Sequence, residues 1–190
     1  HLATMSILIS LFWFMGSTYF TLIPIYAKDF LNAHPIDISK LTVALAIGVG
    51  LGSMLCEKFS RENIDLGVIS IGIISLGLVS FEIFFLATQA SYNECVYLIG
   101  ICISPINRFF LDLVILSAAG ALFVIPMYAS VQSQSQREHR ARVMAAINIL
   151  NAILMVIASI FTFTLLKFEI AANWIFLIVA LFSLVATSLG

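Results

Sequence analysis

Residues 143–166, VMAAINILNAILMVIASIFTFTLL, contain no charged side chain in 24 consecutive positions. A transmembrane helix needs about 20 mainly apolar residues, so this stretch is long enough to cross a bilayer. The whole chain has the same character, because 62% of its 190 residues are hydrophobic and only 10% are charged. Soluble domains have roughly 45–50% apolar and about 25% charged residues. The composition therefore excludes a water-soluble globule and indicates an integral membrane protein.

The distances between charged residues predict an all-α integral membrane protein, with residues 1–190 forming a single six-helix membrane bundle. The apolar stretches between the charged residues are continuous, whereas the strands of a membrane β-barrel would be segments of about ten residues in which apolar and polar residues alternate. Residues 95–107 are too short to span and contain Pro105, so we expect an interfacial or re-entrant segment, or else an extension of the following helix. The six predicted spans are approximately 4–27, 39–57, 65–88, 110–131, 142–167 and 170–189.

Basic residues predict how the bundle is oriented. Six spans place both termini and the loops near 57–64 and 132–142 on one side of the membrane. These two short loops concentrate basic residues, whereas the opposite side mixes four basic residues with several acidic ones. Cytoplasmic loops carry an excess of Lys and Arg, so the loops near 57–64 and 132–142 are predicted to be cytoplasmic.

Small residues predict close contacts between the helices. Gly48 and Gly52 form a G-x-x-x-G face, which allows two helix backbones to approach where lipid gives no hydrophobic drive for association. Gly50 lies between them, but Ser53 and the lack of a preceding strand argue against a dinucleotide-binding fingerprint. The pattern therefore favours helix packing.

Polar side chains within the spans are the candidates for a substrate cavity. Asn148 and Asn151 are three residues apart and are expected to share a helix face. An amide inside the membrane needs a partner, which can be another helix, a water-filled cavity or a polar ligand group. Trp13 and Tyr19 can line the path of an amphiphile or anchor the helix at the interface. With Gln132, these residues are the predicted cavity residues.

Three ionisable residues lie close to or within the spans, where a charge is costly and indicates function by default. Glu82 is about 24 Å along its helix, at 1.5 Å per residue, and is expected to reach water at the far interface. Arg108 and Asp112 are four residues apart, a spacing that pairs side chains on a helix. We expect this pair to anchor the fourth helix at the outer surface.

No catalytic, metal or nucleic-acid pattern accompanies these features. The three histidines, His1, His34 and His139, form no H-E-x-x-H motif, and no G-x-S-x-G elbow occurs. The chain has 9 basic and 10 acidic residues and no basic stripe, which argues against a nucleic-acid partner. We therefore expect neither an enzyme within this chain nor a cofactor or metal.

Residues 53–61, SMLCEKFSR, resemble the G-x-L-A-D-R-x-G-R loop signature of the major facilitator superfamily. Glu57 takes the acidic position, Lys58 and Arg61 take basic positions, and serine replaces both glycines. The longer stretches 48–60, 119–132 and 140–151 are similar to the lysophospholipid transporter branch. That branch includes forms fused to a glycerophospholipid acyltransferase.

The resemblance covers nearly the whole chain and implies the C-terminal six-helix half of a twelve-helix transporter. It implies movement of lysophospholipid across the bacterial inner membrane by alternating access, with Glu57, Lys58 and Arg61 helping to hold a conformational state. The implied partners are the lipid bilayer, a lysophospholipid or other amphiphile, the missing N-terminal six-helix half, and a fused or associated acyltransferase outside this chain.

Two other functions are compatible with the same sequence. The first is proton-coupled efflux of a drug or metabolite on the same fold, which a buried carboxylate relay would favour. The second is a role as the membrane anchor of a phospholipid acyltransferase.

Overall fold

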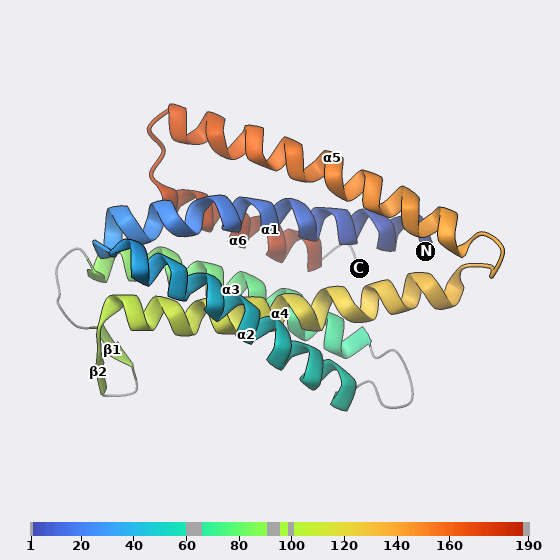
Figure 1. Cartoon of the computed structure of the whole chain (residues 1–190), viewed down its shortest axis with the longest axis horizontal. Helices are drawn as coiled ribbons and strands as arrows, with labels where there is room; N and C mark the ends of the chain where they lie inside the picture. Colours follow the sequence, from blue (N-terminus) through green and yellow to red (C-terminus); the bar gives the residue numbers. More distant parts are fainter. Residues whose placement is uncertain (1, 60–65, 91–95, 99–100, 188–190) are drawn as a thin grey trace.

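The computed structural model describes residues 2–59, 66–90, 96–98 and 101–187, which form a helical bundle with one short β-hairpin (Figure 1). The long apolar runs of the sequence all become helices, because a helix satisfies its backbone hydrogen bonds internally. The helices are α1 (Leu2–Leu31), α2 (Pro35–Phe59), α3 (Leu66–Ala90), α4 (Pro105–Gln134), α5 (Arg140–Lys167) and α6 (Ala172–Thr187), and the strands are β1 (Val96–Leu98) and β2 (Ile101–Ile103).

The helices pack in defined pairs. Helix α4 contacts α2 and α3, helix α3 also contacts α6, and α5 packs mainly against α1. Figure 1 shows α5 at the edge of the bundle, beside α1 and away from α3 and α4. The core accordingly lies between α1, α3, α4 and α6, where Tyr26, Phe109 and Phe176 are fully buried.

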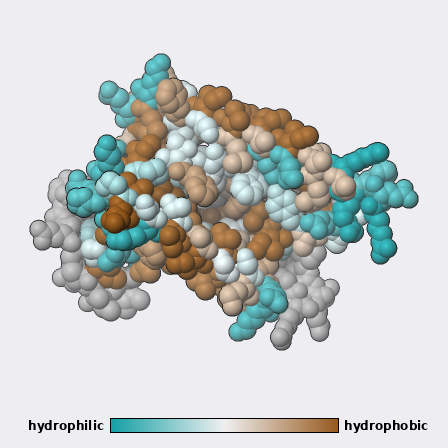
Figure 2. All heavy atoms as spheres, viewed as in Figure 1, coloured by the Kyte–Doolittle hydropathy of each residue, from teal (hydrophilic) through white to brown (hydrophobic). Residues whose placement is uncertain are grey.

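The lengths and composition of the helices support the predicted class of integral membrane protein. Helices α1 to α5 are long and apolar enough to cross a membrane. The described part of α6 has 16 residues, about 24 Å at 1.5 Å per residue, which is less than the roughly 30 Å hydrocarbon core. Figure 2 shows hydrophobic side chains across the middle of the visible face and hydrophilic ones towards its ends. Such a broad apolar surface suits contact with lipid.

The segment predicted to be interfacial or re-entrant forms a short β-hairpin in its described part. Strands β1 and β2 pair antiparallel, with Val96 opposite Ile103 and Leu98 opposite Ile101. Figure 1 shows this hairpin at one end of the bundle, beside the start of α4. Pro105 begins α4 instead of breaking a helix, because the first helical position needs no backbone N–H. The structure therefore shows a two-stranded hairpin where an interfacial or re-entrant segment was expected, and its position relative to the membrane stays a prediction. Residues 105–107 belong to α4, as the alternative expected.

The direction of the helices agrees with the predicted topology. Figure 1 shows the end of α2, the start of α3 and the α4–α5 connection at the same end of the bundle as the N-terminus. The hairpin and the α5–α6 connection lie at the opposite end. The assignment of the first end to the cytoplasm stays a prediction from the basic residues.

The G-x-x-x-G face of α2 is a close contact with α4, as predicted. A Cβ added at Gly48 would overlap the Ser117 side chain and the Val114 carbonyl, and one at Gly52 would lie 2.8 Å from the Cα of Ala118. A Cβ added at Gly50 would have no atom within 4 Å. The two glycines therefore set the distance between α2 and α4, while Gly50 faces away from that contact.

Candidate functional site

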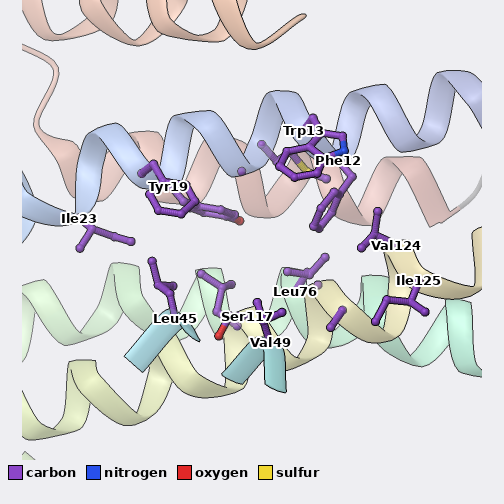
Figure 3. Close-up of a pocket in the computed structure, with 16 residues that line it drawn as sticks. Phe12, Trp13, Tyr19, Ile23, Leu45, Val49, Leu76, Ser117, Val124 and Ile125 are labelled. Carbon is purple, nitrogen blue, oxygen red and sulfur yellow. The ribbon is translucent and has the colours of Figure 1, made fainter. Parts of the chain in front are cut away.

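A cavity of about 350 Å³ lies between the first four helices. Figure 3 shows Phe12, Trp13 and Tyr19 on one side of it and Leu45, Val49 and Ser117 on the other. Its wall is almost entirely hydrocarbon and aromatic. The lining residues are Phe12, Trp13, Met15, Gly16, Tyr19, Phe20, Ile23, Leu45, Val49, Leu76, Leu116, Ser117, Gly120, Ala121, Val124 and Ile125.

The hydrogen-bonding side chains in this wall are already engaged with the protein. The Trp13 indole N–H donates to Tyr128 Oη at 3.1 Å. The Tyr19 hydroxyl is 2.5 Å from Ser80 Oγ. The Ser117 hydroxyl donates to the Leu113 carbonyl at 2.7 Å. The wall therefore offers a ligand mainly apolar contact, which favours hydrocarbon over a polar group.

A polar network connects three helices beside Trp13. Ser10 Oγ on α1 donates to Asn151 Oδ1 on α5 at 2.7 Å. Asn151 Nδ2 then donates to Tyr128 Oη on α4 at 2.8 Å, the same oxygen that accepts from Trp13. Ser10 and Asn151 are buried, with exposed fractions of 0% and 6%. The network satisfies polar groups that would otherwise be costly inside a membrane.

The structure brings some of the predicted cavity residues together and separates others. Trp13 and Tyr19 line the cavity, and Asn151 lies in the adjoining network. Asn148 and Gln132 are exposed and are not among the lining residues. Positions three apart differ by about 60° around a helix of 3.6 residues per turn. The buried stripe of α5 contains Ile147 and Asn151, and Asn148 falls outside it.

The loop candidates occupy one end of the bundle. Glu57 and Lys58 are exposed in the last turn of α2. Arg61 lies outside the described residues. The expected role of these three residues in holding a conformational state stays a prediction.

The three ionisable residues form one cluster between α3 and α4. Arg108 donates to Glu82 Oε1 from Nη2 at 2.8 Å and from Nε at 3.0 Å. The Arg108 Nε is also 3.5 Å from Asp112 Oδ1, so the expected spacing does pair these side chains. Asp112 is 2% exposed, so it lies inside the bundle, and the expected anchoring of α4 at the outer surface stays a prediction. Glu82 pairs across the helices instead of reaching only to water.

Three residues that form hydrogen bonds in or beside the cavity wall were not among the candidates predicted from the sequence. They are Tyr128, Ser10 and Ser80. Tyr128 lies within a long uncharged run, and a buried phenol usually needs a hydrogen-bond partner. The need of a polar side chain for a partner inside the membrane singled out Asn151, and the same reasoning could have identified Tyr128. Ser10 and Ser80 gave no comparable signal, since a serine hydroxyl can instead bond to a carbonyl of its own helix, and both lie within hydrogen-bond distance of one.

Comparisons with known proteins give no relative from which to assign a function: no family model, no curated protein and no solved structure matches the chain. Within the described residues, no group of three or more His, Cys, Asp or Glu side chains could hold a metal ion. The function is therefore argued from the cavity and its neighbours.

Proposed function

We propose that this chain is the C-terminal six-helix half of a major facilitator superfamily transporter that moves lysophospholipid across the bacterial inner membrane by alternating access. The apolar cavity between α1, α2, α3 and α4 is the observation that carries the proposal. It accommodates the acyl chain, while the head group remains near more polar surroundings. The expected second half of the transporter completes the path.

The size and opening of the cavity support an acyl chain as its occupant. Its volume of about 350 Å³ lies at the lower end of the roughly 300–1,000 Å³ range of ligand pockets, which suits part of an amphiphile. Three of its lining residues, Phe20, Val49 and Ile125, are also exposed at the surface, by 63%, 50% and 37%. An acyl chain can therefore enter the cavity from the side of the bundle, between α1, α2 and α4.

A polar network lies behind one part of the apolar wall of the cavity. Trp13 contacts the cavity with its ring system and the network with its N–H. The Tyr128 oxygen accepts from both Trp13 and Asn151, so polar atoms begin directly behind the apolar wall.

The pairing of the helices supports the transporter fold. If α1, α2 and α3 are exchanged with α4, α5 and α6, the α2–α4 pair becomes the α5–α1 pair. The α3–α6 pair becomes itself, and the α3–α4 pair becomes the α6–α1 pair. All of these pairs are in contact, although the α6–α1 contact is much smaller than the α3–α4 contact. Inverted three-helix repeats of this kind occur within each six-helix half of the superfamily.

Proton-coupled efflux on the same fold is the second candidate. The observation that favours it is the placement of Glu82 and Asp112 within the bundle, since intramembrane carboxyl groups serve as proton relays in transporters.

The test is reconstitution of the full-length protein in liposomes, with transport of labelled lysophosphatidylethanolamine as the readout. We expect unlabelled lysophosphatidylethanolamine to compete and glycerophosphoethanolamine, which has the same head group without the chain, not to compete. Absence of lysophospholipid movement, with intact acylation by an associated enzyme, would instead favour the membrane-anchor function. Movement of a drug that requires a pH gradient, without lysophospholipid movement, would favour proton-coupled efflux.

A further inference from the structure

The cluster of Glu82, Arg108 and Asp112 has more negative than positive groups. One guanidinium contacts both carboxyl groups, at 2.8 Å from Glu82 and 3.5 Å from Asp112. Two ionised carboxylates and one arginine would leave a net charge of −1. The Asp112 side chain is only 3% exposed, so this charge would lie largely within the bundle, where an unbalanced charge is strongly disfavoured.

The unused oxygens of the two carboxyl groups make the imbalance specific. Glu82 Oε2 and Asp112 Oδ2 are both buried, and neither has a hydrogen-bond partner in the part of the chain that the structure describes. Arg108 uses the other oxygen of each group. Tyr26 of α1 faces both carboxyl groups, but its hydroxyl donates to the Ile83 carbonyl at 2.7 Å. The site therefore contains two acceptors that lack a donor.

We propose that Glu82 and Asp112 share one proton at neutral pH, so that the cluster is an intramembrane proton-binding site. A proton taken from water converts one carboxylate into a carboxylic acid, whose O–H donates to the other carboxylate. The remaining carboxylate balances Arg108, and the net charge becomes zero. Two carboxyl groups at one site commonly hold a single proton in this way, because like charges in contact cannot both ionise readily.

The surroundings give the proton both a route and a connection to the cavity. The Glu82 side chain is 35% exposed, so it can exchange a proton with the surface while Asp112 stays inside. Ile83, next to Glu82, accepts the hydrogen bond from Tyr26. One turn before Tyr26, Ile23 lines the cavity. The proton site thus adjoins the contact between α1 and α3, and it is independent of which substrate the bundle moves.

Infrared spectroscopy of the full-length protein in lipid tests the proposal. At pH 7 we expect one carboxylic-acid C=O band that shifts in D₂O. The band should disappear in Asp112→Asn and also in Glu82→Gln, because in each variant Arg108 balances the single carboxylate that remains. Asp37→Asn is the control, since Asp37 is paired with Lys40 at 2.7 Å on the surface, and it should leave the band unchanged.

Three results would overturn the proposal. The first is a wild-type protein without a carboxylic-acid band at pH 7. The second is a band that persists in Glu82→Gln, which would assign the proton to Asp112 or another group alone. The third is a band that persists in Asp112→Asn. The Glu82→Gln variant decides the question by itself if Asp112→Asn does not fold, because Glu82 lies at the partly exposed edge of the cluster.

Discussion

The amide nitrogen of Asn151 donates a hydrogen bond of 2.8 Å to the hydroxyl of Tyr128. This bond ties α5 to α4, and the amide oxygen of the same residue accepts from Ser10 of α1. Helix α5 has the smallest buried share of the five long apolar helices. These polar contacts therefore add to a packing contact with α1 that buries only a small part of α5.

Replacing Asn151 by Ala should destabilise the protein by about 1 kcal/mol, because two interhelical hydrogen bonds are lost at about 0.6 kcal/mol each. The remaining partners are not left unsatisfied, since Ser10 can still donate to the Ser6 carbonyl and Tyr128 still accepts from Trp13. Asn148→Ala is the matched control and should be nearly neutral, because Asn148 is exposed. Thermal unfolding in detergent measures both, and equal melting temperatures for the two variants would contradict the assignment.

Replacing Gly52 by Ala should destabilise the protein by about 1–3 kcal/mol, the usual cost of overpacking. The new Cβ would meet the backbone of Ala118, which cannot move aside as a flexible side chain can. Gly50→Ala should leave stability unchanged or raise it by up to about 1 kcal/mol, since Ala favours a helix over Gly and Gly50 faces open space. Melting temperatures of the pair provide the measurement; a loss of stability in Gly50→Ala alone would refute the packing.

Filling the cavity should block the proposed transport. Gly16 lines the cavity, and a Cβ added there meets no atom within 4 Å. Gly16→Leu should therefore occupy the space of the acyl chain without disturbing the backbone, and lysophospholipid movement in liposomes should fall at least tenfold. Gly50→Leu adds the same side chain outside the cavity and should transport normally. If Gly16→Leu keeps wild-type transport at normal expression, the substrate does not use this cavity.

The Tyr19–Ser80 contact should respond unequally to removal of its two partners. Tyr19→Phe should cost about 0.6 kcal/mol, because the Ser80 hydroxyl still donates to the Leu76 carbonyl. Ser80→Ala should cost more, about 1–3 kcal/mol, because it leaves the buried Tyr19 hydroxyl without its partner. Denaturant or thermal unfolding in detergent can rank the two variants, and a larger loss for Tyr19→Phe would argue against this reading of the contact.

The sequence by itself determined the class of the protein and the positions of its helices. Uncharged runs such as 143–166 must satisfy their backbone hydrogen bonds internally in lipid, which leaves helices as the outcome. Gly48 and Gly52 could likewise be assigned to a helix contact from their spacing, because only small residues allow such close approach. These features depend on local composition and on the bilayer, and not on which helix is the neighbour.

The tertiary structure alone decided which polar groups meet. The spacing of Asn148 and Asn151 places both residues on one side of α5, but it could not show where on that side α1 and α4 pack, so it could not show that these helices cover only Asn151. Glu82 and Arg108 are 26 positions apart and on different helices, so their ion pair depends on how α3 packs against α4. The sequence thus determined where polar atoms enter the membrane, and the packing of the helices determined their partners, since a hydrogen bond depends on distances of a few tenths of an ångström.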